Sequence, residues 1–229
     1  MKSESKYIYN LFFTEDGSHS IALIDQNESF HSKYGAVAES NYIYINTGLN
    51  YKTEKIKNVN ILEVGFGTGL NALLTYKTSF FDGLNIYYHA VEPFPLESEV
   101  YCLLNYPEIV KESREVFLTL HQCVENKEIN IANNFIFLKT FEKIQEISLK
   151  DNFYDLVYFD AFNPDLEPDL WSESVFEKIF KAMRTEGVLV TYSTKGIVRR
   201  AMKSAGFIVE KLPGPKGKRE ICRAIKCKR

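Results

Sequence analysis

No stretch of the 229-residue sequence approaches the 18 consecutive apolar residues that a membrane-spanning helix needs. The first six residues are polar and include an acidic one, which is unlike a secretory signal. From these two absences we expect a cytoplasmic protein that has no membrane partner.

Metal-binding patterns are absent as well. The four histidines lack the spacing of zinc ligands, and no CxxC pair occurs among the four cysteines, which are Cys102, Cys123, Cys222 and Cys227. We expect these cysteines to be small buried side chains, as is usual for free cysteine, and we expect no metal site.

Tryptophan is scarce, with a single copy, but 17 phenylalanines and 14 tyrosines bring the aromatic fraction to 14%. The hydrophobic fraction of 45% and the charged fraction of 25% are ordinary for a globular protein and exclude a disordered or fibrous chain. The length suits one α/β domain with appendages, or two small domains at most.

The net charge is low, at −2, but it is unevenly distributed. Residues 211–229 carry eight basic side chains against one acidic side chain, which leaves a net charge of −9 for residues 1–210. Such a segment is most often a solvated tail, but it can also be a patch that faces phosphates. Charge alone does not choose between these interpretations.

The chain is expected to form two parts, an N-terminal extension over residues 1–58 and a larger domain over residues 59–229. In the extension, apolar and aromatic runs predict strands over 7–13 and 19–25, and near-helical spacing predicts a helix over 34–49. In the larger domain, apolar runs predict strands over 59–64, 85–91, 135–138, 154–159 and 187–192.

Helices are expected between the strands of the larger domain, over 70–81, 96–104, 112–124, 141–147, 175–183 and 196–205. Strands that alternate with helices predict a mostly parallel sheet covered on both faces. The last two strands, over 207–211 and 219–225, have no helix between them and predict an antiparallel hairpin at one edge. The fold class is therefore α/β, with a small N-terminal extension that contains β-strands.

A glycine-rich loop, E-V-G-F-G-T-G, follows the first strand of the larger domain and opens its first helix. Glycine lets the backbone turn tightly and approach a bound cofactor where a Cβ atom would collide. The spacing G-x-G-x-G differs from the G-x-G-x-x-G of pyrophosphate-binding loops. It resembles instead the first motif of class I S-adenosylmethionine methyltransferases, which implies a cofactor site at Glu63, Gly65, Gly67 and Gly69.

Two acidic residues stand at strand ends, where ligands bind in open α/β sheets. Glu92 ends the second strand, 27 residues after Gly65, and a carboxylate there can accept two hydrogen bonds from the ribose hydroxyls of a cofactor. Asp160 ends the fourth strand, where a carboxylate can hold an amine N–H and take up its proton during methyl transfer. We predict that Glu92 binds the cofactor and that Asp160 is catalytic.

The loop after Asp160 contains two prolines and the only tryptophan. The ring faces of Phe162 and Trp171 can stack on a base or stabilise a cationic charge, so both residues are candidates for substrate binding. For Trp171, a buried position in the core is an equally good interpretation.

With this loop the sequence resembles one family specifically, the tRNA 5-methylaminomethyl-2-thiouridine methyltransferases, which comprise the N-terminal domain of MnmC and the stand-alone MnmD. The string D-A-F-N-P…P-D-L-W-S is similar to the family signature D-x-F-x-P…N-P-x-W. Further similar stretches are G-F-G-T-G-L-N, G-A…E-S over residues 35–40, E-P-F-P-L from residue 92 and G-K-R-E from residue 217. The match extends over most of the chain.

The resemblance implies a fold, a cofactor and a reaction. The fold is a class I (Rossmann-like) methyltransferase sheet with strand order 3-2-1-4-5-7-6, and the cofactor is S-adenosylmethionine. The acceptor is an aminomethyl group on the wobble uridine of tRNA, so tRNA is the expected partner. In the bifunctional proteins a flavin oxidoreductase follows this domain; because this sequence ends at Arg229, we expect a separate oxidoreductase to make the aminomethyl group.

The resemblance also assigns further residues. Asn71 is expected to contact the cofactor. Where related enzymes often carry Gly-Asp near the adenine amine, this sequence has Lys139-Thr140, and either the Thr140 hydroxyl or the backbone there is expected to accept the hydrogen bond. Charge and the family match together predict tRNA contacts at Arg199, Lys216, Lys218 and Arg219.

Two other functions stay open. Aminopropyltransferases share the glycine loop, the ribose acid and the aspartate after the fourth strand, and Asp165, Glu167 and Asp169 could bind a small polyamine. The basic C-terminal segment would then have no purpose. The second alternative is a non-catalytic RNA-binding module of the same fold, against which the intact Glu92 and Asp160 speak.

Overall fold

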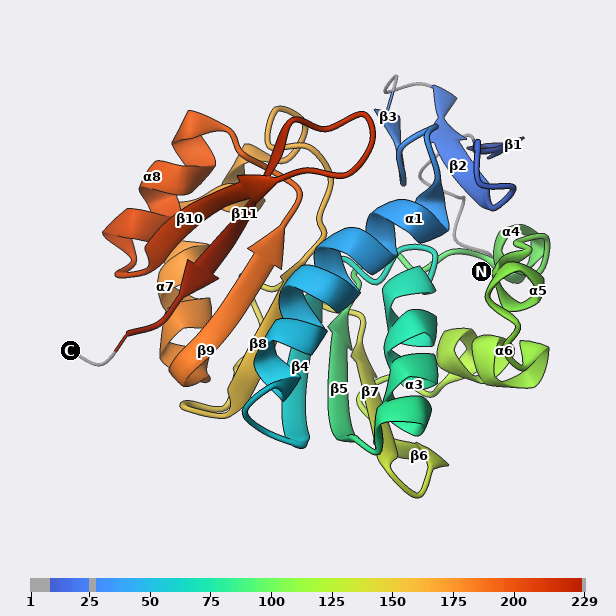
Figure 1. The fold of residues 1–229 in the computed structure, drawn as a ribbon, viewed down its shortest axis with the longest axis horizontal. Coiled ribbons are helices and arrows are strands. Elements are labelled where there is room, and N and C mark those ends of the chain that lie inside the picture. The colour runs from blue at the N-terminus through green and yellow to red at the C-terminus, as the bar shows by residue number, and fades with distance from the viewer. Residues whose placement is uncertain (1–8, 25–27, 228–229) are drawn as a thin grey trace.

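The computed structural model describes residues 9–24 and 28–227, and Figure 1 shows a large sheet covered by helices with a small sheet beside it. The large sheet has eight strands in the order β10-β11-β9-β8-β4-β5-β7-β6. Five neighbouring strands are parallel: β4 (Asn58–Val64), β5 (Asn85–Val91), β7 (Phe135–Thr140), β8 (Tyr154–Phe159) and β9 (Met183–Thr191). All six residues of β8 are buried, as expected for a central strand covered on both faces.

The edges of the sheet are antiparallel. The hairpin of β10 (Ile208–Pro213) and β11 (Glu220–Ile225) joins the sheet through β11 and β9, which confirms the predicted C-terminal hairpin. Counted from β4, the strand order is the 3-2-1-4-5-7-6 that the resemblance implies. One short strand that the sequence did not reveal, β6 (Ile129–Ala132), extends the far edge beside β7.

One face of the sheet is covered by the helical part of the N-terminal segment and by α3 (Leu70–Asp82) (Figure 1). The predicted helix over 34–49 is confirmed as a continuous helical segment made of α1 (Ala36–Ser40), η2 (Asn41–Asn50) and α2 (Tyr51–Thr53), with η2 wound as a π-helix. Ile43, Tyr44 and Leu49 of this segment are buried in the same hydrophobic cluster as the strands. The N-terminal segment is therefore part of the core.

The opposite face is covered by α7 (Glu173–Ala182) and α8 (Gly196–Ser204), whose apolar side chains form a second buried cluster with the strands. Three short helices, α4 (Ser98–Tyr101), α5 (Tyr106–Val110) and α6 (Arg114–Gln122), follow β5. The 3-10 helix η3 (Pro168–Trp171) precedes α7.

The helix predicted over 141–147 is wrong, because these residues form bends and turns. Ile144 and Ile147 are buried in the second cluster, which satisfies the apolar spacing without a helix. The Lys178 ammonium donates hydrogen bonds to the carbonyls of Ile144, Gln145 and Ile147, so these acceptors are satisfied by a side chain instead of a helical N–H.

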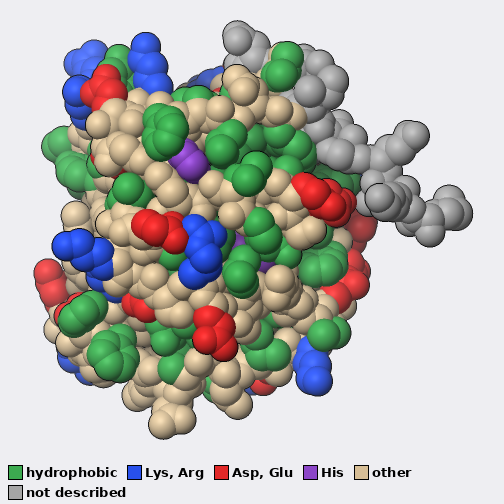
Figure 2. Space-filling model, turned by 90° about the vertical axis from the view of Figure 1, so that its right-hand side faces the viewer, with side chains coloured by type: hydrophobic (Ala, Val, Ile, Leu, Met, Phe, Trp, Pro, Cys, Tyr) green, Lys and Arg blue, Asp and Glu red, His purple; other side chains and the backbone are tan. Residues whose placement is uncertain are grey.

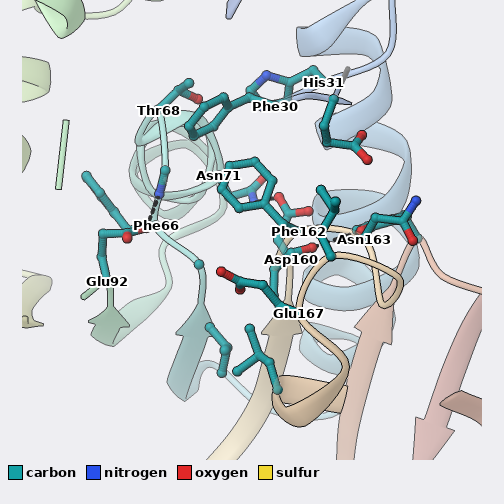
Figure 3. Close-up of a pocket in the computed structure, with 18 of the residues that line it drawn as sticks. Phe30, His31, Phe66, Thr68, Asn71, Glu92, Asp160, Phe162, Asn163 and Glu167 are labelled. Atoms are coloured by element: carbon teal, nitrogen blue, oxygen red, sulfur yellow. Dashed lines mark hydrogen bonds between the residues drawn. The ribbon is translucent and has the colours of Figure 1, made fainter. Parts of the chain in front are cut away.

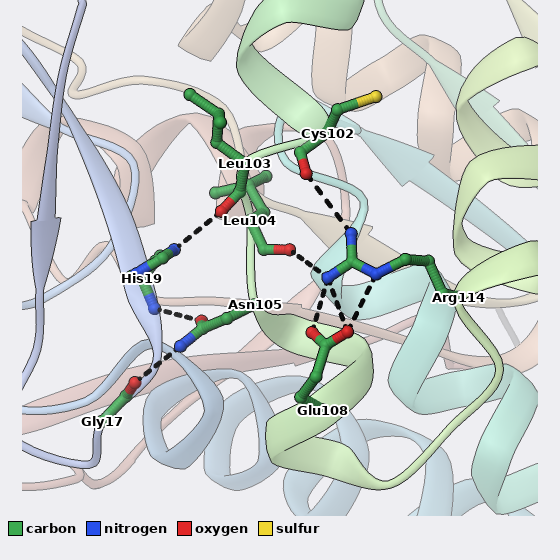
Figure 4. A network of polar contacts seen from close by, with 8 residues as sticks. All are labelled: Gly17, His19, Cys102, Leu103, Leu104, Asn105, Glu108 and Arg114. Carbon is green, nitrogen blue, oxygen red and sulfur yellow. Dashed lines mark hydrogen bonds and ion pairs between the residues drawn. The ribbon is translucent and has the colours of Figure 1, made fainter.

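The small sheet consists of β1 (Tyr9–Phe13), β2 (His19–Leu23) and β3 (Glu28–Ser29). Hydrogen bonds connect it to the α4–α5 region (Figure 4). The Asn105 side chain accepts a hydrogen bond from the backbone N–H of His19 at 2.8 Å and donates one to the Gly17 carbonyl at 2.9 Å. Arg114 braces the same region through a bidentate pair with Glu108 and two backbone carbonyls.

The polar start, the beginning of the first predicted strand and the last two basic residues lie outside the described residues. Over residues 9–24 and 28–227, no helix has both the length and the apolar character needed to cross a membrane. Cys123 and Cys222 are buried as expected, whereas Cys102 and Cys227 are exposed.

Candidate functional site

A pocket of about 550 Å³ opens at the carboxyl ends of β4, β5 and β8 (Figure 3). This is the position where open α/β sheets bind ligands, and the volume is in the usual range for a small-molecule site. One wall consists of the loops after these strands. The other consists of β3 and the segment that follows it, the first part of the long helical segment and Lys218 from the turn between β10 and β11.

The glycine loop between β4 and α3 brings backbone to the pocket at Gly65 and Gly67. Gly65 has φ +90° and leaves no room for a Cβ, which would lie 2.4 Å from the backbone oxygen of Asp160. Gly67 has φ +49°, and its Cβ would lie 3.0 Å from the Phe30 ring. Gly69 begins α3 and does not line the pocket.

Glu92 ends β5 and is held in place by the backbone. Its Oε2 accepts the N–H of Gly67 at 2.9 Å, and its Oε1 accepts the N–H of Phe94 at 2.9 Å. Burial raises the pKa of Glu92, and these two hydrogen bonds act in the opposite direction. Each carboxylate oxygen keeps lone-pair capacity toward the pocket, so a cis-diol has two fixed acceptors.

Asn71, in the first turn of α3, connects two acidic residues. Its Nδ2 donates to Glu63 Oε1 at 3.1 Å and to Asp160 Oδ2 at 2.8 Å. Glu63 is fully buried beneath the loop and does not line the pocket, and burial raises its pKa. The structure therefore assigns Asn71 to the pocket wall, with Glu63 supporting its orientation from behind.

Asp160 lies at the end of β8, between the two walls of the pocket. Burial raises its pKa to about 6, partly offset by Asn71 and by the Tyr44 hydroxyl, and the Glu39 charge raises it further. The Tyr44 hydroxyl is close enough to act on this pKa but makes no hydrogen bond of standard geometry among the described residues. A carboxyl that titrates near neutral pH can accept and release a proton under ordinary conditions.

The loop after Asp160 places its two candidate rings differently. Phe162 lines the pocket and meets Phe30 edge to face, with ring centroids 5.0 Å apart. Trp171 is only 2% exposed, packs on Phe159 and donates from Nε1 to the Phe162 carbonyl at 2.8 Å. The expected substrate contact at Trp171 is therefore corrected: this residue holds the loop that carries Phe162.

Thr140 requires a second correction. It is buried, donates to Asn126 Oδ1 at 2.9 Å, is hydrogen-bonded to His89 Nε2 at 3.0 Å and does not line the pocket. On the Glu92 side, the pocket is lined by Phe94 and by residues 143–145 of the loop after β7. Residues 143–145 were not expected at the pocket, because their sequence pattern predicted a helix over 141–147.

The predicted basic contacts separate into two groups. Lys218 lines the pocket, with its Nζ 3.3 Å from Glu39 Oε1 and 4.9 Å from the Tyr192 ring centroid. Lys216 pairs with exposed Glu15 at 2.5 Å, and Arg199 donates to the Thr194 carbonyl. Neither they nor exposed Arg219 line the pocket.

Glu39, Ser40 and Tyr44 form a polar wall that was not expected from the sequence, and all three line the pocket. The stretch G-A…E-S over residues 35–40 contained part of that signal. Over the described ranges, no group of three or more His, Cys, Asp or Glu side chains is arranged to hold a metal ion.

Residues 105–227 match the family model described as S-adenosyl-L-methionine-dependent methyltransferase. Among curated proteins, the chain is similar to the tRNA 5-methylaminomethyl-2-thiouridine biosynthesis bifunctional protein MnmC of Aromatoleum aromaticum, with 28% identity over 93% of this chain and 34% of the relative. The MnmC of Campylobacter hominis is also 28% identical, over 96% of this chain and 32% of the relative. The chain thus spans about a third of the length of these relatives.

Two solved structures share the fold. MNMC2 from Aquifex aeolicus superposes with a TM-score of 0.74 and 24% identity, over 97% of this chain and 72% of that chain. Spermidine synthase from Thermotoga maritima superposes with a TM-score of 0.58 and 13% identity, over 95% of this chain and 69% of that chain. Both likenesses extend over the N-terminal segment, which agrees with its place in the core.

Proposed function

The chain belongs to the S-adenosyl-L-methionine-dependent methyltransferase family, and from that premise we propose that it methylates an aminomethyl group on the wobble uridine of tRNA. The reaction converts 5-aminomethyl-2-thiouridine to 5-methylaminomethyl-2-thiouridine. The names of the MnmC relatives support this acceptor. The observation that carries the proposal is Asp160, a carboxyl that lines the pocket at the end of β8 and whose pKa of about 6 suits it to accept an amine proton.

The pocket fits S-adenosylmethionine in three respects. Glu92 presents two fixed carboxylate oxygens for the ribose hydroxyls. The backbone at Gly65 and Gly67 is open to close approach of a ligand. Asn71 Oδ1 is buried without a hydrogen-bond partner in the described part of the chain and is a ready acceptor for the ammonium of the methionine moiety. When bound, S-adenosylmethionine supplies an electrophilic methyl group on a sulfonium ion.

Asp160 and its neighbours account for the proton. An alkylamine is mostly protonated at neutral pH, and its nitrogen attacks only after one proton has left. Asp160 can accept that proton, while Asn71 fixes the direction of its carboxylate. Once deprotonated, the nitrogen would be a nucleophile for the methyl group that bound S-adenosylmethionine would supply, and the sulfur would leave as the neutral thioether of S-adenosylhomocysteine. Phe162 supplies a ring face beside this position.

The test uses the purified protein, S-adenosylmethionine and tRNA that carries 5-aminomethyl-2-thiouridine. We expect mass spectrometry of the digested nucleosides to show the methylamino product, and we expect Asp160→Asn to reduce its formation strongly. Unmodified wobble uridine in tRNA from the same source is the matched acceptor control. The proposal also requires an oxidoreductase activity that makes the aminomethyl group of the acceptor.

A second function, aminopropyl transfer to a small polyamine, is favoured by Glu167 and Asp169, which line the pocket, and by the fold shared with spermidine synthase. Asp165, the third acid considered for that role, pairs instead with Lys195 outside the pocket. Incubation with decarboxylated S-adenosylmethionine and putrescine distinguishes the two functions. Spermidine formation, with no methylation of the tRNA, would establish the alternative.

A further inference from the structure

The wall of the pocket formed by the N-terminal segment carries buried polar atoms without partners. Glu39, Ser40 and Tyr44 are 9%, 1% and 2% exposed and line the pocket. Glu39 Oε2 accepts the backbone N–H of Ser32 at 2.8 Å, and Glu39 Oε1 lies 3.3 Å from the Lys218 ammonium. Ser40 Oγ and the Tyr44 hydroxyl have no hydrogen-bond partner of standard geometry within the described residues. Because an unsatisfied buried polar atom is costly, these two hydroxyls beside the buried Glu39 carboxylate point to a polar ligand.

The charge of the pocket specifies the sign of that ligand. Two lysines, Lys143 and Lys218, line the pocket, against six acidic side chains, which are Glu28, Glu39, Glu92, Asp160, Glu167 and Asp169. Such a cavity attracts cations and repels the phosphates of a nucleic acid. A cationic substituent on a nucleoside can therefore enter, while the phosphate backbone stays outside.

Lys218 shows which kind of cation this wall accommodates. Its ammonium lies 3.3 Å from Glu39 Oε1 and 4.9 Å from the centroid of the Tyr192 ring. A carboxylate and a ring face together are a typical environment for an ammonium ion. The second oxygen of Glu39 is fixed by the Ser32 N–H, so the carboxylate is already oriented before a ligand arrives.

On this basis we infer that Glu39, Ser40 and Tyr44 form the subsite that binds the amine of the acceptor beside Asp160 and selects it over a hydroxyl group. The inference rests on the proposed function for the identity of the acceptor. Glu39 holds the positive charge, before transfer on the primary ammonium and afterwards on the methylated one. Asp160 takes the single proton that must leave before the nitrogen can attack.

The test measures binding of two nucleosides by calorimetry, with the protein saturated with S-adenosylhomocysteine. The probes are 5-aminomethyluridine and 5-hydroxymethyluridine, which differ in one polar group. We expect the parent to bind the amine more tightly, and Glu39→Gln to weaken amine binding at least tenfold without changing the affinity for S-adenosylhomocysteine. The hydroxymethyl nucleoside should bind equally to parent and variant.

Glu15→Gln is the matched control. Glu15 pairs with Lys216 as Glu39 pairs with Lys218, between the same N-terminal segment and the same turn, but that pair is exposed and outside the pocket. Equal losses in both variants would mean that the ion pairs act only by holding the segments together, and the inference would be wrong. A parent that binds both nucleosides equally, or neither, would also overturn it.

Tyr44→Phe covers the case in which Glu39→Gln does not fold, because it removes one hydroxyl and keeps the ring that packs on Tyr158. It should weaken amine binding several-fold and leave binding of the hydroxymethyl nucleoside unaffected; unchanged selectivity would contradict the inference.

The tRNA methylation assay distinguishes a failure of the subsite from a failure of the proposed function. Selective amine binding without tRNA methylation would refute the proposed function but support the amine subsite. Methylation of the tRNA by Glu39→Gln with an unaltered KM would support the proposed function but refute the subsite.

Discussion

The two walls of the pocket differ in whether backbone groups or side chains position the functional groups. On the wall after β4 and β5 the backbone positions the functional group, since the N–H groups of Gly67 and Phe94 hold both oxygens of Glu92. On the wall of the N-terminal segment side chains do so. Glu39 pairs there with Lys218, and Ser40 and Tyr44 present hydroxyls that have no hydrogen-bond partner of standard geometry within the described residues. Asp160 lies between the two.

This difference suits two kinds of ligand. A backbone-built wall tolerates most side-chain changes, apart from those at its glycines, and therefore suits a ligand that is the same throughout a family, such as a shared cofactor. A wall built from side chains can change its specificity by single substitutions, as suits the acceptor. We therefore expect substitutions on the first wall to change cofactor affinity and those on the second to change acceptor selectivity.

The largest effect is expected where the walls meet. Asp160→Ala should lower the rate of methyl transfer by about 10²- to 10⁴-fold, the usual contribution of a positioned proton acceptor, with little change in cofactor affinity. Single-turnover kinetics with saturating S-adenosylmethionine measure it. Asp165→Ala is the control, because Asp165 is in the same loop but pairs with Lys195 outside the pocket. A near-normal rate in Asp160→Ala would make this carboxylate structural.

The next effect tests the backbone-built wall. Gly67→Val should weaken S-adenosylmethionine binding tenfold or more, because a side chain there fills the pocket wall against Phe30 and a β-branched residue disfavours φ +49°. Calorimetric titration measures the affinity. Gly83→Ala is the control, since Gly83 also has positive φ, at +61°, but nothing lies within 4 Å of its added Cβ. If both variants bind the cofactor normally, Gly67 is not at the site.

The sequence predicted the backbone-built wall far better than the other wall. The spacing of Gly65, Gly67 and Glu92 is a local property of two strand ends, and the structure brings these residues together as expected. The catalytic candidate Asp160 was found in the same way, from the end of a strongly apolar strand that is buried along its whole length. Site residues at strand ends can be predicted from the sequence because a parallel sheet places the carboxyl ends of all its strands at one edge.

The second wall could not be predicted from the sequence, because its residues are far apart along the chain. Glu39 and Lys218 meet only because the C-terminal hairpin returns to the N-terminal helical segment, and no local pattern specifies that contact. The basic segment was interpreted from its charge and the family match, and neither reveals that two of its lysines pair with glutamates of the N-terminal segment. Trp171 illustrates a related difficulty, because an aromatic residue beside a site can face either the ligand or the core.

A smaller effect concerns the free energy of unfolding, which the burial of the Asp160 carboxylate lowers. Its pKa is raised from 3.8 to about 6, so the folded state binds the proton more tightly than the unfolded chain does, and stability falls as pH rises through this window. Above pH 6 the cost reaches at most about 3 kcal/mol. Asp160→Asn should therefore increase the free energy of unfolding relative to the parent at pH 8 more than at pH 4. Denaturant unfolding at both pH values measures it, and a difference that does not change with pH would contradict the raised pKa.

The smallest effect concerns the outward side of the turn between β10 and β11, whose inward side carries Lys218. Figure 2 shows the side of the molecule that lies to the right in Figure 1, where basic side chains gather at the upper left around an acidic one and both signs are dispersed among hydrophobic side chains elsewhere. Lys216 and Arg219 are exposed, and the exposed pair of Lys216 with Glu15 is weak enough for a phosphate to replace it. These two residues, without Lys218, are therefore the candidates for tRNA contact.

Replacing Lys216 and Arg219 by Ala should weaken tRNA binding and reduce the slope of log affinity against log salt by roughly one for each phosphate that the variant no longer binds. Cofactor affinity and nucleoside selectivity should stay unchanged, because neither side chain lines the pocket. Lys181→Ala is the control, since Lys181 makes a similar exposed pair with Asp151 but lies just before the start of β9, at the opposite end of the strands from the pocket. Filter binding from low to moderate salt measures the slopes. If the double variant and the parent have equal slopes, the tRNA docks on another surface, and the turn contributes only its inward side, through Lys218, to the acceptor wall.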